Sequence, residues 1–171
     1  MARQPFGRSY LDPRRSLNFL DSCAFDPKYS PEHEASEKLR QLSNEDVLVL
    51  HLAHSTQKEV DHPNTPVWVK REAATFIYSI ETSLTPGEVE QKAAILAILT
   101  GNGKPDKYAA DAAHVFEAGK YCGYFITADE RILKKKHELE KVCAAVIVKP
   151  SKLLEILESH LRSREDSQRT S

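Results

Sequence analysis

The sequence has no long hydrophobic run. Its apolar stretches are only a few residues long, whereas a helix that crosses a bilayer needs about 20 consecutive apolar residues. The opening "MARQPFGRSYLDPRRS" has no apolar core after its basic residues, so we expect no secretory signal there. A membrane-spanning protein and a secreted protein are therefore both disfavoured.

Cysteine is scarce, and charge of one sign does not dominate. The three cysteines, Cys23, Cys122 and Cys143, are far apart and form no CxxC pair. This spacing argues against a disulfide framework or a zinc ribbon and predicts a reducing, cytoplasmic compartment. The net charge is −1, so no global basic field attracts nucleic acid. A nucleic-acid partner would have to be held by local cations.

The length and the balance of residues favour one globular domain. The chain has 171 residues, and a domain commonly has about 100–200 residues. Four short apolar runs are typical of strands, and because they are continuous rather than alternating, they suit a parallel sheet that is covered on both faces. These runs are residues 16–21, 46–52, 123–127 and 144–148.

Helical patterns separate the predicted strands. They cover residues 31–42, 55–62, 66–80, 85–99, 106–121, 130–139 and 150–161. Alternating strands and helices predict a three-layer α/β/α domain with a central parallel sheet. Four helical segments fall between the second and third strands, and we expect some of them to protrude. Residues 1–15 are predicted to form an irregular arm, residues 16–160 the domain and residues 161–171 a disordered tail.

Four acidic residues fall where a parallel sheet binds its ligands, at the carboxyl ends of the strands. Asp21 ends the first apolar run, and Asp129 lies two residues beyond the third. Glu59 lies on the helix after the second run, and Asp111 lies on the helix that leads to the third. We therefore expect four distant segments to bring their carboxylates to one edge of the sheet.

Clustered carboxylates repel one another unless they are protonated or neutralised. A hard divalent cation such as Mg²⁺ or Mn²⁺ prefers oxygen ligands and would neutralise them. Such an ion polarises a phosphoryl oxygen and activates water, which suits phosphodiester hydrolysis. Two alternatives stay open: Asp129 is a first-turn acid beside a capping box of Thr127 and Glu130, or Glu59 is an ordinary solvated acid.

Four segments resemble the PIN-domain family. "LNFLDSCAF" is similar to the first-strand motif of the family, and "STQKEVDHP" to the helix that carries its second acid. "AADAAHVFEAGKYCGYFITADERIL" resembles its most specific segment, in which an Asp on a helix precedes a strand that ends in Thr, any residue and Asp. "VIVKPSKLLEIL" resembles the closing strand and helix. The resemblance covers roughly residues 16–158, although the segment 62–105 does not match the common toxin pattern.

The resemblance implies a metal-dependent ribonuclease on a Rossmann-like α/β/α sandwich. Many members are toxins that a small antitoxin protein neutralises, and many form homodimers, so both partners are expected beside the RNA substrate. The resemblance implies that the catalytic and metal-binding residues are Asp21, Glu59, Asp111 and Asp129. Ser22 and Thr127 would support them. Glu59 would complete the site or orient the attacking water.

Basic residues directly after Asp129 are candidates for contacts with the RNA backbone. Arg131, Lys134 and Lys135 have the spacing of one helix face. A non-catalytic module of the same fold, which binds RNA or a protein, is the alternative function.

Other motifs are weaker. His51, His54 and His62 crowd near the second acid without a family role. Cys23 with a histidine could serve a hydrolase, but strand alternation points Cys23 away from Ser22 and predicts a structural cysteine. "TGNGKPD" lacks the phosphate-loop spacing and is interpreted as a helix cap and turn.

Overall fold

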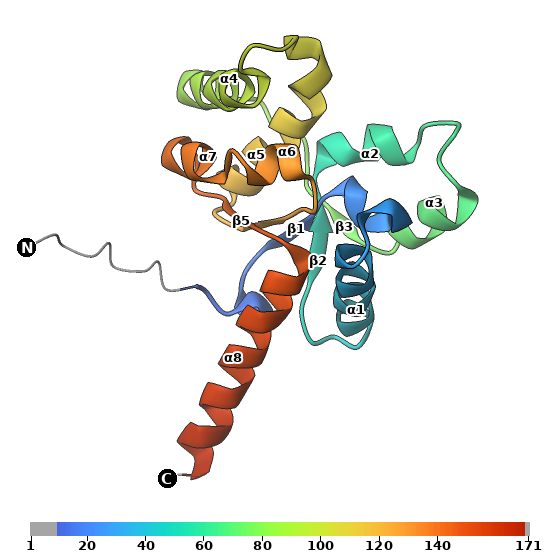
Figure 1. Cartoon of the computed structure of the whole chain (residues 1–171), viewed down its shortest axis with the longest axis vertical. Helices are drawn as coiled ribbons and strands as arrows, with labels where there is room; N and C mark the ends of the chain where they lie inside the picture. Colours follow the sequence, from blue (N-terminus) through green and yellow to red (C-terminus); the bar gives the residue numbers. More distant parts are fainter. Residues whose placement is uncertain (1–9, 170–171) are drawn as a thin grey trace, which may run out of the picture.

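A five-stranded parallel sheet forms the centre of the molecule. The computed structural model describes residues 10–169, apart from the side chains of residues 77–78 and 166–169 (Figure 1). The strand order is β3-β2-β1-β4-β5, and every neighbouring pair is parallel. The strands are β1 (Asn18–Leu20), β2 (Leu50–Leu52), β3 (Ile77–Tyr78), β4 (Tyr124–Ile126) and β5 (Val146–Val148).

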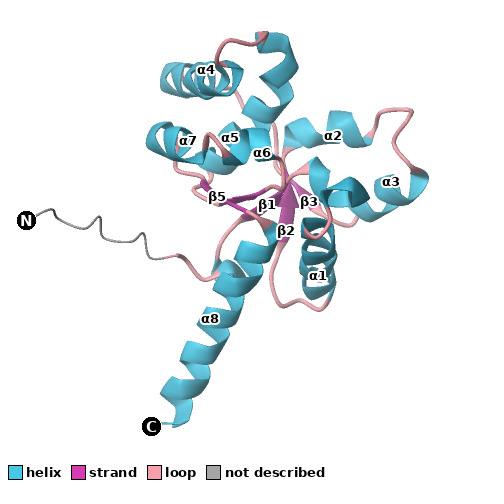
Figure 2. Ribbon diagram, in the orientation of Figure 1, coloured by secondary structure: helices cyan, strands magenta, loops and turns pink. Residues whose placement is uncertain are grey.

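Helices cover both faces of the sheet, so the domain has three layers (Figure 2). One layer contains α1 (Glu32–Asn44), α3 (Val67–Ala73) and α8 (Pro150–Arg169). The other contains α4 (Pro86–Thr100), α5 (Ala109–Lys120), α6 (Glu130–Leu133) and α7 (Lys136–Val142). The helix α2 (His54–Val60) packs against α3 and α5. Short 3₁₀ helices occupy Pro13–Arg15 (η1), Ser22–Phe25 (η2), Pro27–Tyr29 (η3) and Pro105–Tyr108 (η4).

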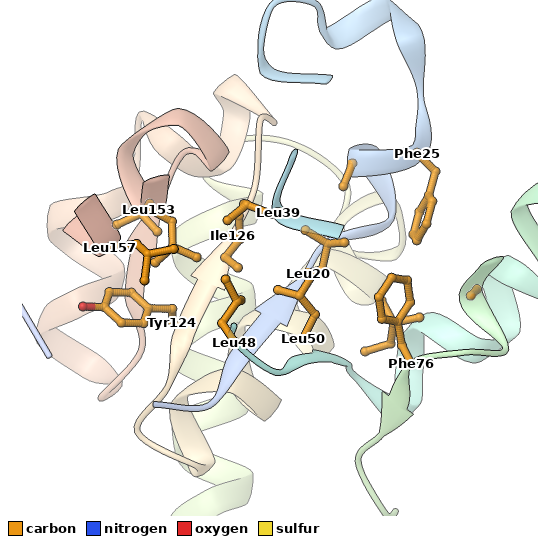
Figure 3. Close-up of a cluster of buried hydrophobic side chains, with 14 of the residues drawn as sticks. Leu20, Phe25, Leu39, Leu48, Leu50, Phe76, Tyr124, Ile126, Leu153 and Leu157 are labelled. Atoms are coloured by element: carbon orange, nitrogen blue, oxygen red, sulfur yellow. The ribbon is translucent and has the colours of Figure 1, made fainter. Parts of the chain in front are cut away.

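Two hydrophobic clusters lie on the two faces of the sheet. Successive strand residues point to opposite faces, so Leu20 joins the cluster with α1 and α8, whereas Phe19 joins the cluster with α5. Figure 3 shows Leu20 and Ile126 of the strands packed near Leu39 of α1. Burial on both faces explains why the strand segments are continuously apolar, and it confirms the predicted parallel sheet and α/β class.

The predicted helix over residues 66–80 is wrong in its second half. The helix α3 ends at Ala73, and Ile77–Tyr78 form the edge strand β3, in which Ile77 pairs with His51 of β2. Aromatic and β-branched residues favour strands when a neighbouring strand is available. The sequence alone does not show that neighbour, which explains the error. The chain then returns through α4, which packs on α5 and α7.

Three other boundaries differ from the sequence predictions. The helix expected over residues 130–139 is interrupted, so α6 and α7 are separate helices. Residues 13–15 of the expected irregular arm form η1, and Pro13 is buried, whereas residues 1–9 lie outside the described residues. The helix α8 continues to Arg169, through most of the expected tail, because extending an existing helix costs less than nucleating one.

The predicted caps of α4 are confirmed. Thr85 and Glu88 form a reciprocal capping box, and Gly101 ends the helix with a positive φ of 51°. A glycine adopts this conformation without the strain that a side chain would add. "TGNGKPD" is therefore a helix cap and turn, as the sequence indicated. Among residues 10–169, none of the helices combines the length and apolarity that crossing a bilayer requires.

Candidate functional site

The first pair of acids lies at the carboxyl edge of the sheet. β1 and β4 are in register, with Leu20 opposite Ile126, so the residues that follow them lie side by side. Thr127 Oγ1 donates a hydrogen bond to Asp21 Oδ2 at 2.6 Å and accepts one from the Asp129 backbone N–H at 3.1 Å. Asp21 and Asp129 are 5% and 7% exposed. The sheet register therefore holds two buried carboxylates near each other, with Thr127 between them.

Two helices add the other two acids. α2 begins directly after β2 and carries Glu59, and α5 leads to β4 and carries Asp111. All four predicted acids line one pocket of about 260 Å³, which we call the acid pocket. Its wall consists of Asp21, Ser22, Cys23, Asp26, Lys28, Tyr29, Glu59, Asp111, Asp129 and Arg131. The structure thus brings the four acids and Ser22 together.

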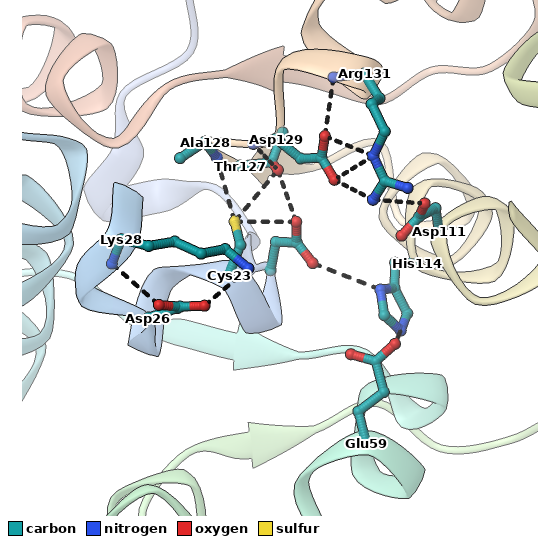
Figure 4. Close-up of polar contacts among 11 residues, drawn as sticks. Cys23, Asp26, Lys28, Glu59, Asp111, His114, Thr127, Ala128, Asp129 and Arg131 are labelled. Carbon is teal, nitrogen blue, oxygen red and sulfur yellow. Dashed lines mark hydrogen bonds and ion pairs between the residues drawn. The ribbon is translucent and has the colours of Figure 1, made fainter. Parts of the chain in front are cut away.

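Arg131 bridges two of these acids (Figure 4). Its guanidinium donates to both oxygens of Asp129, with Nε at 3.1 Å from each, and Nη2 lies 3.4 Å from Asp111 Oδ2. Asp129 also caps α6 by accepting from the Arg131 backbone N–H at 2.8 Å. The N-cap of α6 is therefore Asp129 itself, so the alternative in which Thr127 and Glu130 form a capping box around a first-turn Asp129 is wrong. Asp129 also lines the acid pocket.

The predicted basic face for RNA does not form on one helix. α6 ends at Leu133, and Lys134 and Lys135 occupy the turn before α7. Lys135 pairs with Glu138 at 3.6 Å, whereas Arg131 is turned toward the acids. The interruption between α6 and α7 thus breaks the i, i+3, i+4 spacing on which that prediction depended.

His114 is a second counter-charge, and the sequence interpretation gave it no role in the site. Its side chain is buried on α5, with Nδ1 3.6 Å from Asp21 Oδ1 and Nε2 3.9 Å from Glu59 Oε1 (Figure 4). Both separations exceed hydrogen-bond range, so the imidazole acts on the carboxylates through its charge. A signal was present: His114 follows Asp111 by three residues, which places both on one helix face.

The pKa shifts in the acid pocket reflect burial together with the charges that face each group. Burial raises the pKa of the Asp111 carboxyl to about 6, and the charge of Asp21 adds to this shift while Arg131 opposes it. Burial works against ionisation of Asp21, but His114 and Thr127 outweigh burial and lower its pKa. Burial likewise works against protonation of His114, yet the nearby carboxylates, Asp21 foremost, raise its pKa. The wall of the acid pocket therefore contains five carboxylates, Asp26 included, and the cationic side chains beside them are Lys28, Arg131 and the protonated His114.

Cys23 lies in the acid pocket, contrary to the orientation that strand alternation predicted. β1 ends at Leu20 and the chain turns into η2, so alternation no longer applies. Cys23 Sγ donates to Asp21 Oδ2 at 3.2 Å and accepts from the Ala128 backbone N–H at 3.3 Å. Burial and the Asp21 charge raise the pKa of this thiol far above its ordinary value. A neutral thiol that supports Asp21 is a poor nucleophile, which argues against a Cys–His hydrolase.

The three histidines near the second acid point elsewhere. His51 packs against Phe19, with ring centroids 5.5 Å apart. His54 Nε2 lies 3.2 Å from Glu81 Oε2, and the exposed His62 accepts a hydrogen bond from the Asn64 backbone N–H. None of them lines the acid pocket.

Glu117 of α5 fixes the helix that carries Glu59. Its carboxylate accepts from the backbone N–H groups of His54 and Ser55 at 2.6 and 3.0 Å, and from Ser79 Oγ at 2.6 Å. It thereby satisfies donors at the start of α2. We expect Glu117→Gln to lower the free energy of unfolding by about 1 kcal/mol, because the amide keeps only one acceptor oxygen and loses the charge. Urea unfolding would measure this, and the exposed Glu90→Gln on α4 is the control, which should be neutral.

The donor set suits a hard divalent cation, although the side chains are not arranged around one. Among the described residues, no three His, Cys, Asp or Glu side chains are placed to hold a single ion, since Arg131 and His114 already pair with the acids. Carboxylate oxygens are nevertheless the ligands that Mg²⁺ and Mn²⁺ prefer. Within residues 10–169, the wall of the acid pocket contains five carboxylates and only two basic side chains, Lys28 and Arg131, so the residues fit such an ion.

Comparisons of the chain with protein-family models, with curated proteins and with solved structures found no match. The assignment of function therefore depends on the geometry and electrostatics of the acid pocket.

Proposed function

We propose that the protein is a divalent-metal-dependent ribonuclease with a PIN-like fold. The observation that carries the proposal is the meeting of four carboxylates, from four distant segments, in one pocket at the carboxyl edge of a parallel sheet. Such an edge is where α/β sheets bind ligands. An excess of negative charge there is unfavourable without a cation. A divalent metal ion would neutralise the excess, and the same acids would then serve as its ligands in a metal-assisted reaction.

Asp21, Asp111 and Asp129 would hold Mg²⁺ or Mn²⁺ after Arg131 releases Asp111 and Asp129, with which it now pairs. When bound, the ion would polarise a phosphoryl oxygen and acidify water. The protein's own contribution is positional: Thr127 and Cys23 orient Asp21 through hydrogen bonds, and Arg131 orients Asp129. Arg131 is also the cation best placed to meet a substrate phosphate once it leaves the acids, because its side chain is 48% exposed.

Glu59 would accept a proton from the attacking water. It is the most open of the four acids, with 37% of its side chain exposed, compared with 18% for Asp111. His114, whose Nε2 lies 3.9 Å from Glu59 Oε1, would help to orient the Glu59 carboxylate through its charge.

A labelled single-stranded RNA tests the proposal. We expect cleavage in millimolar Mn²⁺, loss of cleavage in EDTA, and recovery when Mn²⁺ is restored. Cleavage that persists in EDTA would contradict the metal-dependent mechanism. The antitoxin and the homodimer that the resemblance implies stay predictions, as does the cytoplasmic location.

A non-catalytic module is the second candidate, and one observation favours it: Arg131 and His114 already neutralise part of the acid pocket. Thermal unfolding separates the two candidates. A metal site raises the melting temperature with increasing Mn²⁺, because the ion binds the folded state. An unchanged melting temperature, together with intact RNA, would favour the module.

A further inference from the structure

A second pocket adjoins the acid pocket and is mostly apolar. It lies between the η2–η3 segment and the α2–α3 segment and has a volume of about 440 Å³. Its apolar wall consists of Phe25, Pro27, Val60, Pro66, Trp68 and Val69. Ser22, Asp26 and Glu59 line both pockets. A ligand in this apolar pocket would therefore reach directly to the carboxylates.

The floor of the apolar pocket is well packed, whereas one large aromatic is open to solvent. The Phe25 side chain is buried against Phe76, with ring centroids 6.2 Å apart, and against the Arg40 guanidinium at 5.0 Å. Trp68 of α3 is 48% exposed, and it is the only tryptophan in the sequence. A rigid apolar floor beside a half-exposed indole is preorganised for a flat apolar ligand.

We propose that the apolar pocket binds a nucleobase of single-stranded RNA, stacked on Trp68, next to the phosphate that is cleaved. The inference depends on the proposed function and specifies its substrate. The volume lies in the range of small-ligand sites, about 300–1,000 Å³, and bases stack on exposed aromatic rings without strict sequence preference. The shared wall favours this ligand, because a nucleobase and its own phosphate are separated by one sugar and could occupy the two adjoining pockets together.

The charges around the two pockets favour this occupant. Lys28 lines the acid pocket, and its Nζ lies 3.0 Å from Oδ2 of Asp26, a residue that lines both pockets. A cation therefore lies where the RNA backbone would pass from one pocket to the other. Arg131 also lines the acid pocket, where it pairs with Asp129 and Asp111. A base in the apolar pocket would thus place its phosphate at the acid pocket, whose wall contains Lys28 and Arg131 as well as the acids. A duplex would not fit, because its bases are paired and stacked internally.

Trp68 itself reports on binding, since its fluorescence is the sole indole signal of the chain. The Asp111→Asn variant, which is expected to cleave RNA too slowly to interfere, is titrated with a short single-stranded RNA in Mn²⁺. We expect saturable quenching with this RNA, no quenching with the same ribose-phosphate chain lacking its bases, and none with duplex RNA. Equal quenching by the baseless chain would overturn the proposal.

Substitutions test the same contact without relying on fluorescence. In the Asp111→Asn background, Trp68→Ala is expected to weaken binding of labelled single-stranded RNA by about 5- to 150-fold, the range for one stacked base, and Trp68→Phe should recover most of it. Tyr10→Ala removes another exposed aromatic (36%) that does not line either pocket, and it should not change binding.

The outcomes distinguish this inference from the proposed function. If Trp68→Ala, made in the wild-type background, binds and cleaves RNA like the wild type, while chelation abolishes cleavage, the base site is wrong and the nuclease stands. If protein concentration alone changes the Trp68 signal, with a rise in molecular mass, the pocket is covered by a second copy and the proposal is overturned.

Discussion

The Asp111→Asn variant is expected to cleave RNA in Mn²⁺ at least about 100-fold more slowly than the wild type. Even residues that only hydrogen-bond to metal ligands often contribute about 10- to 100-fold to activity, and Asp111 is proposed as a ligand itself. The same substitution is expected to stabilise the protein when divalent cations are absent. The loss of cleavage follows from the loss of a proposed metal ligand, and the stabilisation follows because burial, with the charge of Asp21 beside it, disfavours the ionised Asp111 carboxyl in the metal-free protein.

The direction of the pH dependence follows from the pKa of Asp111, which rises from 3.8 to about 6 on folding. Between these values the folded state binds more protons than the unfolded state, so stability falls as pH rises from about 4 to about 6 and stays lower above. The full shift corresponds to about 3 kcal/mol, which solvent screening of a partly exposed group reduces to about 2 kcal/mol. Asp111→Asn should therefore raise the free energy of unfolding at pH 8 by about this amount and change it little at pH 4.

Urea unfolding of both proteins in EDTA, at pH 4 and at pH 8, measures the stabilisation. In millimolar Mn²⁺ the wild type should instead have the higher melting temperature, because the ion stabilises only the wild type. Asp106→Asn is the matched control: this exposed acid lies on η4, just before α5, and outside the acid pocket. Equal stability at both pH values, with an equal response to Mn²⁺, would refute the role of Asp111.

The sequence predicted the convergence of the acids because that convergence depends on strand ends. Asp21 and Asp129 follow buried apolar runs, and parallel strands in register place the residues after them together. By contrast, β3 was missed because a strand of two residues depends on its neighbour β2 more than on its own sequence. Local patterns cannot supply that contact.

The counter-charges were missed because side-chain direction depends on local backbone geometry. Arg131 reaches Asp129 and Asp111 because Asp129 caps the single-turn helix α6, whereas a longer helix was expected there. Cys23 turns into the acid pocket because η2 replaces the strand after Leu20. A carboxylate cluster implies that some cation neutralises it, but charge balance alone does not identify which residue supplies that cation.

Loss of His114 should destabilise the protein strongly. Replacing it with leucine removes the charge that faces Asp21, a buried carboxylate on which the hydrogen bonds from Thr127 and Cys23 remain. Removing one partner of a buried ion pair typically costs about 3–5 kcal/mol, because the other charge is left without compensation. We therefore expect His114→Leu to lower the free energy of unfolding by about 3 kcal/mol at pH 6 in EDTA.

Two further measurements show whether charge, rather than packing, causes the loss. The pKa of His114 is raised above its ordinary 6.5, so its contribution is fully present below pH 6.5 and disappears as pH rises through the raised value. The difference between wild type and His114→Leu should therefore shrink by pH 9. Adding Asp21→Asn to His114→Leu should recover part of the stability, because the uncompensated charge is gone, whereas the exposed His137→Leu should be neutral. A loss that is the same at both pH values and in the double variant would mean that His114 stabilises the fold by packing alone, and that the acid pocket is held together by other contacts.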